Sequence, residues 1–528
     1  MNALLVLYAG NLSSEANKPL LNGKNSIAIA IERSQKFPGV HKTVILAGAS
    51  MESRQLTSEA AHFGDIKIET RPAWTVAALL DTLASLSSGF DFAYFAWADC
   101  PFLDPVLAEK MAERHIRYAA EYTYADGWPY GISPELLSPE TAAILAKIAA
   151  DLDENSINIT REALFSLLQK DINAFDIETE ISAVDLRCHR LNLCADSKRN
   201  FLLLQSFLTA NGHYIPETSA IERIIEEKPE ILRTLPAFYP VQVFEGCPHR
   251  CSFCPWAVHA KNAVQGRGFM EKGLFESLLD TIMAFSGDAV IDISLWGEIA
   301  LHPQKIELIE SVLRRNSLSL VIETSGVGWK HSELELCAEI AGKYTEKTGK
   351  FPAPLSWIVS LDTSDPERYQ EIRGAGFAEA AACAKKLLSL FPKDTYVQAV
   401  RTEGAEEDIE RFYRSWKETA GSAANVIIQK YDDFCGMLPR KQAADLSPVQ
   451  RKPCWHLLRD MPVLLDGSVP LCRQQIAAAD MAIILGNVFT DPLDKIWERG
   501  QEQYIKHTKS VYENSLCAGC DEYYTFNF

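Results

Sequence analysis

Apolar strand-like runs alternate with helical stretches over the first part of the chain. The predicted strands cover residues 3–8, 43–47, 66–70 and 92–96, and the predicted helices cover 26–36 and 76–86. Because nearly continuous apolar strands, at 3–8, 43–47 and 92–96, alternate with helices, we expect an α/β domain with a parallel sheet covered by helices on both faces. Polar and helical material follows at 139–208, so the first predicted domain spans residues 1–215.

The alternation resumes near residue 240 and repeats six times. Strands are predicted at 241–244, 290–295, 318–322, 357–361, 396–400 and 426–429, with helices near 272–285, 304–315, 332–345, 376–390 and 406–418. Six βα units fall short of a closed eight-stranded barrel, so we expect a partial (β/α)6 TIM barrel over 240–432. Its site should lie at the C-terminal strand ends, where Cys247, Glu298, Ser325, Asp362 and Arg401 fall.

Two shorter regions complete the predicted division into domains. Residues 216–239 are helical, charged and interrupted by proline, which is typical of a linker. Residues 433–528 are turn-rich and contain several cysteines. A domain this small usually needs a staple such as a metal cluster to fold.

Composition and charge narrow the classes of partner. The formal net charge of −18 disfavours non-specific binding to nucleic acid or to an anionic membrane, so we expect neither as a partner. The apolar start at residues 1–10 lacks a basic flank and is too short for a signal peptide or a spanning helix. We therefore expect a cytoplasmic protein, in which thirteen cysteines indicate metal ligands rather than disulfides.

Three cysteines lie within eight residues, directly after the first predicted barrel strand. Cys247, Cys251 and Cys254 have CxxxCxxC spacing. This spacing lets three thiolates bind three irons of a [4Fe–4S] cubane and leaves the fourth iron open. The alternative is a zinc site, with His249 or His259 as the fourth ligand.

The cysteine loop and the motifs after it resemble the radical S-adenosylmethionine (SAM) superfamily with a C-terminal SPASM-type extension, over residues 240–528. The resemblance implies that SAM chelates the open iron and is cleaved reductively to a 5′-deoxyadenosyl radical, which takes a hydrogen atom from a substrate. The whole chain resembles proteins described as spiro-SPASM. That resemblance supplies no substrate. The SPASM-type extension implies a peptide or protein substrate, and the first domain, described below, implies a nucleotide-sugar or glycan-related one. We expect a reductant such as flavodoxin or ferredoxin.

Short motifs at the predicted strand ends carry the resemblance and imply the SAM contacts. SLWGE at 294–298, TSG at 324–326, and SLD at 360–362 with IRG at 372–374 resemble the family's GGEP, TNG and SlD…iRG motifs, although Trp296 and Ile299 depart from the first. Taken singly, such residues would more often form turns and helix caps. The implied SAM contacts are Phe253, Gly297, Glu298, Ser325, Ser360 and Arg373. Asp362 and Arg401 are candidate catalytic residues by position.

Four late cysteines, Cys454, Cys472, Cys517 and Cys520, resemble the SPASM pattern of cysteines around a hairpin followed by CxxC. The resemblance implies an auxiliary [4Fe–4S] cluster, and four thiols also suit a zinc site. Asp466-Gly467 predicts the hairpin turn. Cys435 could replace one of these ligands or be an ordinary buried thiol, and we expect the thiol.

The first domain resembles sugar nucleotidyltransferases, particularly cytidylyltransferases. Lys18-Pro-Leu after the first strand and Asp99-Cys-Pro-Phe-Leu at a strand end carry the resemblance. It implies a Rossmann-like sheet, with Asp99 and Lys18 at a nucleotide and Mg²⁺ site. Residues 11–16 lack the glycines and the arginine of active members, which favours a binding or scaffold role. A bifunctional enzyme with an active nucleotidyltransferase and a non-enzymatic metal-binding scaffold are the alternative functions.

Overall fold

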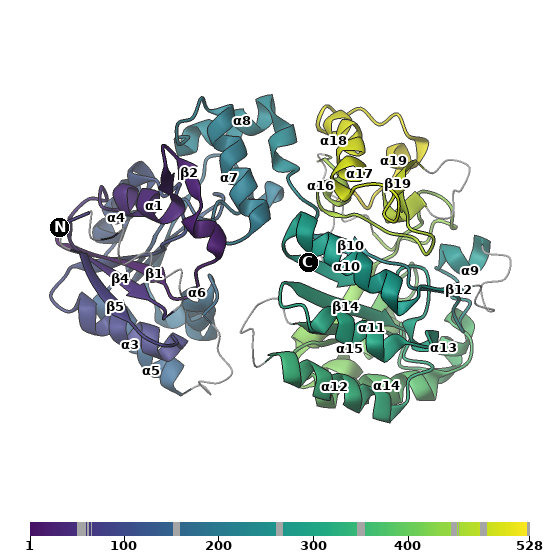
Figure 1. Cartoon of the computed structure of the whole chain (residues 1–528). Helices are drawn as coiled ribbons and strands as arrows, with labels where there is room; N and C mark the ends of the chain where they lie inside the picture. Colours follow the sequence, from purple (N-terminus) through teal and green to yellow (C-terminus); the bar gives the residue numbers. More distant parts are fainter. Residues whose placement is uncertain are drawn as a thin grey trace. The chain divides into compact units, whose positions relative to one another are not determined.

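The computed structural model describes residues 1–49, 60, 63–64, 66–151, 159–259, 268–345, 354–444, 451, 453–475 and 483–524. The chain divides into two compact units, Met1–Thr234 and Leu235–Phe528 (Figure 1). Helix α8 (Thr218–Glu227), from the segment predicted as a linker, belongs to the first unit. None of the described helices has both the length and the hydropathy that a membrane crossing requires.

A seven-stranded sheet in the order β5-β4-β1-β6-β8-β7-β9 forms the centre of the first unit. In chain order the strands are β1 (Ala3–Ala9), β4 (Val40–Ala47), β5 (Ile66–Thr70), β6 (Phe92–Trp97), β7 (Tyr122–Asp126), β8 (Glu135–Leu137) and β9 (Ile177–Ile181). Every residue of β1 and β6 is buried, as continuous apolar runs require. The predicted α/β sheet is confirmed.

The sheet of the first unit differs from the prediction at one strand. Strands β5, β4, β1 and β6 are parallel, but β8 runs antiparallel to both β6 and β7. A parallel return needs a crossover of a dozen or more residues, and residues 127–134 are too few. The sheet is therefore mixed at this edge.

Helices cover both faces of this sheet. In Figure 1, α1 (Ser26–Ser34) and α4 (Pro105–Arg117) lie above the strands, and α3 (Val76–Ser87) and α5 (Pro139–Ala150) lie below them. Local capping sets their starts: the side chain of Thr75 accepts a hydrogen bond from the backbone N–H of Ala78, and Asp104 accepts one from Val106. Helices α6 (Ala163–Leu168) and α7 (Lys198–Ala210) follow.

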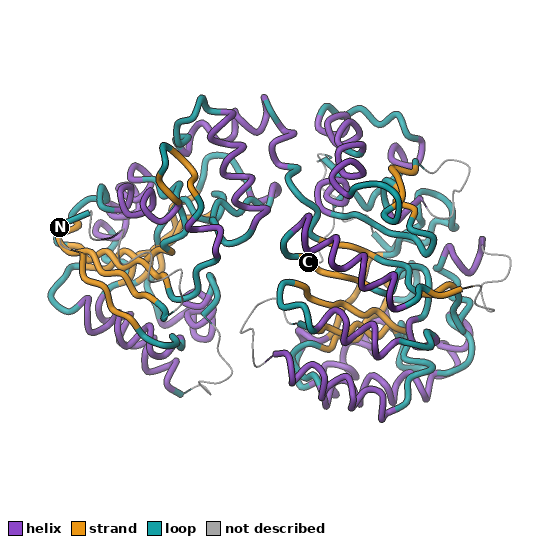
Figure 2. The backbone as a smooth tube through the Cα atoms, viewed as in Figure 1, coloured by secondary structure: helices purple, strands orange, loops and turns teal. Residues whose placement is uncertain are grey.

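The second unit contains a six-stranded parallel sheet in sequential order, β10-β13-β14-β15-β16-β17. Figure 2 shows strands in orange and helices in purple. The strands are β10 (Phe238–Pro240), β13 (Ala289–Asp292), β14 (Leu318–Thr324), β15 (Leu355–Ser360), β16 (Thr395–Arg401) and β17 (Val426–Lys430). The helices between them are α10 (Lys272–Ser286), α11 (Lys305–Leu313), α12 (His331–Thr345), α13 (Pro366–Ile372), α14 (Phe377–Leu390) and α15 (Glu406–Ala420). The predicted partial (β/α)6 barrel is confirmed.

The first barrel strand lies earlier than predicted. Strand β10 ends at Pro240, and Gln242 donates its backbone N–H to the carbonyl of Val463 at 2.8 Å. Phe244–Glu245 forms β11, which pairs antiparallel with β12 (Gly268–Phe269). The apolar run at 241–244 therefore reflects burial against the C-terminal region.

The C-terminal region packs into the same hydrophobic core as the barrel: Leu457, Val463 and Trp497 belong to the cluster that contains Ile291 and Trp357. Its elements are α16 (Trp455–Arg459), β18 (Ser468–Pro470), β19 (Ile484–Asn487), α17 (Leu493–Arg499), α18 (Gln501–Thr508) and α19 (Ser515–Gly519). Asp466-Gly467 lies in a turn, with Gly467 at φ 84°, but this turn precedes β18 and does not connect β18 to its antiparallel partner β19.

Candidate functional site

A cavity of about 270 Å³ lies at the C-terminal ends of the barrel strands. The thiols of Cys247, Cys251 and Cys254 line it. All of the residues expected to contact SAM line it as well, namely Phe253, Gly297, Glu298, Ser325, Ser360 and Arg373. Residues from four separate strand ends are thus brought to one space.

The cysteine loop is held against the end of α13. The backbone N–H of Ser252 donates to the carbonyl of Ile372 at 3.0 Å, and that of Arg250 donates to the carbonyl of Arg373 at 3.3 Å. The guanidinium of Arg373 lies 5.5 Å from the ring centre of Phe253, within cation–π range. The IRG motif therefore positions the loop as well as lining the cavity.

Gly297 allows two backbone segments to meet beside the cysteines. A Cβ atom at this position would lie 1.9 Å from the carbonyl oxygen of Phe244, which no side chain tolerates. The N–H of Glu298 donates to the carbonyl of Gly246 at 2.8 Å. Trp296, which stands where the family has glycine, adopts φ 53° and packs its ring on Phe434.

The carboxylate of Glu298 is buried and joins two strand ends. It accepts hydrogen bonds from Thr324 Oγ1 at 2.6 Å, from the N–H of Ser325 at 2.7 Å and from the N–H of Ala300 at 3.2 Å. Burial raises the pKa of Glu298. That Glu298 also accepts the amino group of SAM stays a prediction.

A second polar network in the cavity centres on Glu323, which sequence reasoning missed. Ser360 Oγ and Gln398 Nε2 each donate to Glu323 Oε1 at 2.9 Å, and Gln398 Nε2 lies 3.2 Å from Ser360 Oγ. The place of Glu323 directly before the TSG motif was the signal that could have identified it. Three adjacent strand ends are tied together by this network.

The two candidate catalytic residues do not line the cavity in the described part of the chain. Asp362 is buried, forms an ion pair with Arg373 and accepts a 2.8 Å hydrogen bond from the N–H of Val400. Its geometry therefore supports a positioning role. A catalytic role for Arg401, which ends β16, stays a prediction.

His249, a candidate zinc ligand, lies apart from the cavity lining. Its Nδ1 is 3.3 Å from the carbonyl oxygen of Arg373, its ring packs edge-on against Tyr369, and it is 3% exposed. Burial lowers its pKa to about 4, so the ring is neutral at pH 7. The side chain of His259 lies outside the described part of the chain.

The late cysteines gather in the C-terminal region. The pKa of Cys454 is raised by its burial and by Cys520 and Cys517, and that of Cys472 by its burial and by Cys454 and Cys520. Thiols that influence one another in this way share one small region. The set predicted from the sequence is therefore brought together by the fold.

The chain is 36% identical to an uncharacterized protein of Treponema pallidum (strain Nichols) over 374 residues, which cover 69% of this chain and 98% of that protein. The chain therefore belongs to the same family as that Treponema pallidum protein. Residues 454–521 match the SPASM family, an iron–sulfur cluster-binding domain. The match confirms the predicted SPASM-type extension.

Solved structures similar to the chain include the following. A cytidylyltransferase from Leptospira borgpetersenii covers 44% of this chain and 95% of its own, at 14% identity and a TM-score of 0.36. Streptococcus suis SuiB bound to precursor peptide SuiA covers 74% of this chain and 88% of its own, at 15% identity and a TM-score of 0.42. The anSMEcpe structure with bound AdoMet covers 53% of this chain and 82% of its own, at 16% identity and a TM-score of 0.39.

The SPASM region receives a fifth thiol from outside its matched residues. Cys435 is half-buried, and a hydrogen bond with Cys520 is the largest cause of its raised pKa. The expectation that Cys435 is an ordinary thiol rather than a ligand stays a prediction, although its side chain is half-buried instead of buried. The sulfurs of Cys472 and Cys520 each accept a backbone N–H, from Gln474 at 3.2 Å and from Glu522 at 3.3 Å.

The spacing of the sulfur atoms bears on the type of metal site. Among the described residues, the ligand groups whose atoms all lie within 4.8 Å of one another are Asp99–Cys100–Cys194 and Asp432–Asp433–Asp521, and neither predicted cysteine set is among them. Tetrahedral zinc with 2.3 Å bonds would hold its sulfurs about 3.8 Å apart.

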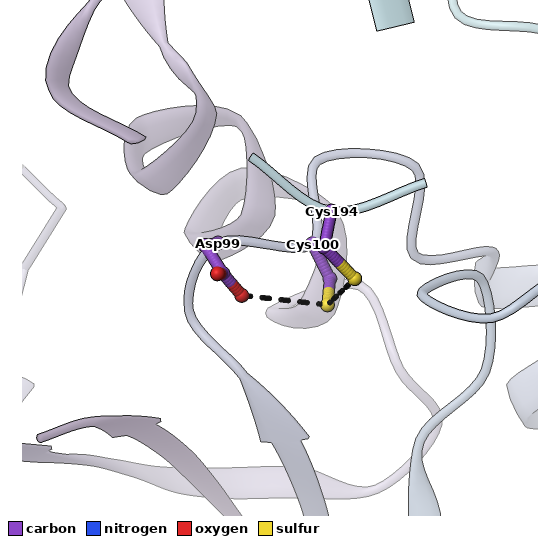
Figure 3. Close-up of side chains that lie close together, drawn as sticks. All are labelled: Asp99, Cys100 and Cys194. Carbon is purple, nitrogen blue, oxygen red and sulfur yellow. Dashed lines mark hydrogen bonds between the residues drawn. The ribbon is translucent and has the colours of Figure 1, made fainter. Parts of the chain in front are cut away.

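The residues at the nucleotide site predicted in the first unit do not fit Mg²⁺. Asp99 is 1% exposed, and Arg161 binds both of its oxygens at 2.6 and 3.1 Å. The neighbouring ligand atoms are the sulfurs of Cys100 and Cys194, 3.3 Å apart (Figure 3). Mg²⁺ prefers oxygen ligands and binds thiols poorly. Lys18 pairs instead with Glu15 at 2.7 Å.

Proposed function

We propose that this chain is a radical SAM enzyme. Cys247, Cys251 and Cys254 would hold a [4Fe–4S] cluster, with SAM on its open iron. The observation that supports this most is that three thiols and six expected SAM contacts line one cavity. When bound and reduced, the cluster supplies the electron that splits SAM into methionine and a 5′-deoxyadenosyl radical, which becomes 5′-deoxyadenosine on taking a hydrogen atom from the substrate.

The chain's own residues would bind and orient SAM. Arg373 is held in place by Asp362 and presents a guanidinium to the cavity, where it can bind the SAM carboxylate. Phe253 lies beside it and offers an apolar face to adenine. Glu298 lines the same cavity, where it would accept the amino group of SAM.

The SPASM domain would hold one auxiliary [4Fe–4S] cluster through Cys454, Cys472, Cys517 and Cys520. The family match and the mutual influence of these thiols support this assignment. Four protein ligands leave no open iron, which favours electron transfer over substrate binding at this cluster. A donor such as flavodoxin or ferredoxin would supply the electrons.

We propose that the first unit does not transfer nucleotides. Binding Mg²⁺ at Asp99 would require breaking a buried ion pair with Arg161, which also lies 3.1 Å from Asp196. Breaking such a pair is costly because it leaves an uncompensated charge. A binding or scaffold role, with a peptide or small-molecule substrate processed in the second unit, is consistent with this arrangement.

The decisive experiment combines an iron count with an assay for SAM cleavage. The full chain is reconstituted anaerobically with iron and sulfide, reduced with dithionite and incubated with SAM. About eight irons per chain and formation of 5′-deoxyadenosine are expected, since each cubane holds four irons. Cys251→Ala should lose half of the iron and all 5′-deoxyadenosine.

The matched control is Cys188→Ala, a half-buried thiol of the first unit, which should retain both iron and activity. Iron loading without 5′-deoxyadenosine, in the presence of crude peptide and metabolite extracts, would contradict the proposal. Binding of zinc in place of iron would instead support a non-enzymatic metal-binding scaffold.

A further inference from the structure

The charged residues that line the cavity differ in whether they have a partner. Six of them form a hydrogen bond or an ion pair with other described residues: Asp292, Glu298, Glu323, Arg373, Lys430 and Asp432. The seventh, Arg473, forms neither with any residue that the structure describes. Arg473 is half-buried and directly follows Cys472 of the SPASM domain.

Four carboxylates act on Arg473 at longer range, in the order Asp460, Glu522, Asp432 and Glu323, and each is engaged elsewhere. Asp460 lies 2.6 Å from His456 Nδ1 and accepts a hydrogen bond from Arg459 Nε at 2.7 Å, and Glu522 pairs with Lys430 at 2.7 Å. Asp432 accepts hydrogen bonds from Gln474 Nε2 at 2.5 Å and from the N–H of Phe434 at 2.7 Å. Glu323 accepts from Ser360 and Gln398. All four carboxylates contribute only a Coulombic attraction to Arg473. The donors of its guanidinium therefore remain available to a group inside the cavity.

We propose that Arg473 binds an anionic oxygen group, a carboxylate or a phosphate, on the substrate of this enzyme. A guanidinium presents paired donors that match both groups in a bidentate geometry. A half-buried position strengthens this interaction, because less water competes for the donors. The inference rests on the proposed function only in assigning the cavity to the substrate.

In this proposal the two arginines of the cavity bind different molecules. Arg373 comes from the barrel, is neutralised by Asp362 and is expected to bind SAM. Arg473 comes from the SPASM domain and has no such counter-ion in contact. A substrate that carries a negative group would then lie between SAM and the SPASM domain, and a purely cationic substrate would be disfavoured.

Chemical labelling of arginine tests the assignment without knowledge of the substrate. The reconstituted full chain, saturated with SAM, is treated with phenylglyoxal, and modified arginines are quantified by peptide mass spectrometry. Arg473 should react about tenfold faster than Arg373, the factor that about 1.4 kcal/mol of pairing produces. Inorganic phosphate or acetate should slow its labelling about tenfold when present well above its dissociation constant.

The two anions distinguish the source of the negative group. Protection by phosphate alone indicates a phosphorylated substrate, and protection by acetate alone indicates a carboxylate. Equal reactivity of Arg473 and Arg373, or no protection by either anion, would overturn the proposal. Slower labelling of Arg473 with SAM than in a parallel sample without SAM would also overturn it, because Arg473 would then belong to the SAM site.

A variant separates this inference from the proposed function. Arg473→Gln should abolish phosphate or acetate binding measured by calorimetry, with the iron count and the SAM dissociation constant retained. Arg440→Gln, whose side chain contacts Gln442 outside the cavity, is the matched control and should retain anion binding. If anions protect Arg473 but SAM is not cleaved, only the proposed function is contradicted. If SAM is cleaved but anions do not protect Arg473, only this inference is contradicted.

Discussion

Arg373 and Asp362 form an ion pair inside the barrel, with 6% and 3% of their surfaces exposed. The same arginine hydrogen-bonds the cysteine loop through its carbonyl, which accepts the N–H of Arg250. The pair thus links the end of β15 to the loop that carries the cluster cysteines. The SLD and IRG motifs act as one structural unit.

Removing one member of this pair should be costly. Asp362→Ala leaves the Arg373 guanidinium buried without a counter-ion, so the free energy of unfolding should fall by about 3–5 kcal/mol. Urea denaturation of the apo chain measures the change. Glu367→Ala, on the exposed side of α13, should change it by less than about 0.5 kcal/mol. Equal effects of the two variants would contradict the role assigned to the pair.

The close approach at Gly297 should be intolerant of any side chain. In Gly297→Ala the new methyl group meets the carbonyl of Phe244, so the backbone before the cysteine loop must move. We expect loss of SAM binding, measured by equilibrium dialysis of the reconstituted protein. Gly342→Ala in α12 is the control, since a Cβ there meets nothing within 4 Å. That control should stabilise the helix by about 0.5–1 kcal/mol.

Acid should destabilise the first unit through His115. Its Nδ1 lies 2.9 Å from Thr123 Oγ1, and burial lowers its pKa from 6.5 to about 4. Between these values the unfolded chain binds a proton that the folded chain does not, so stability falls as pH drops from 6.5 to 4. NMR titration of the ring measures the pKa directly. A value near 6.5 would refute the prediction, and His115→Gln should flatten the pH dependence of unfolding over this window.

The ion pair between Arg161 and Asp99 should be structural. Arg161→Ala should lower the free energy of unfolding by about 3–5 kcal/mol, because Asp99 then stays buried and unpaired. Arg187→Ala breaks an exposed pair with Asp185 and should cost at most about 1 kcal/mol. Thermal denaturation of both variants measures the difference. Magnesium-dependent CTP turnover by the wild type, lost in Asp99→Ala, would show that the site is catalytic after all.

The fifth thiol of the SPASM region should be dispensable for cluster assembly. Cys435→Ala should retain the auxiliary iron, because four other cysteines complete the coordination of a cubane. Cys520→Ala should lose about four irons per chain, since each cubane holds four. Iron analysis and electron paramagnetic resonance of the reduced proteins compare the two. If Cys435→Ala loses iron and Cys520→Ala retains it, Cys435 is the ligand.

The sequence by itself determined the features that depend on residues close together in the chain. The apolar runs at 3–8 and 92–96 became strands within a residue or two, because a strand buried on both faces must be apolar throughout. The six βα repeats indicated the partial barrel. The CxxxCxxC loop and the strand-end motifs indicated which side chains would meet, since parallel strands bring their C-terminal ends to one edge.

Only the tertiary structure decided the contacts between distant segments. Arg161 reaches Asp99 across 62 positions, and Arg473 reaches the cavity from the SPASM domain. The pairing of Gln242 with Val463 ended the first barrel strand early, and the short connection before β8 reversed that strand. These outcomes depend on which segments pack together. The local hydrophobic pattern does not specify which distant segments pack together, because any partner of suitable chemistry satisfies burial and hydrogen bonding.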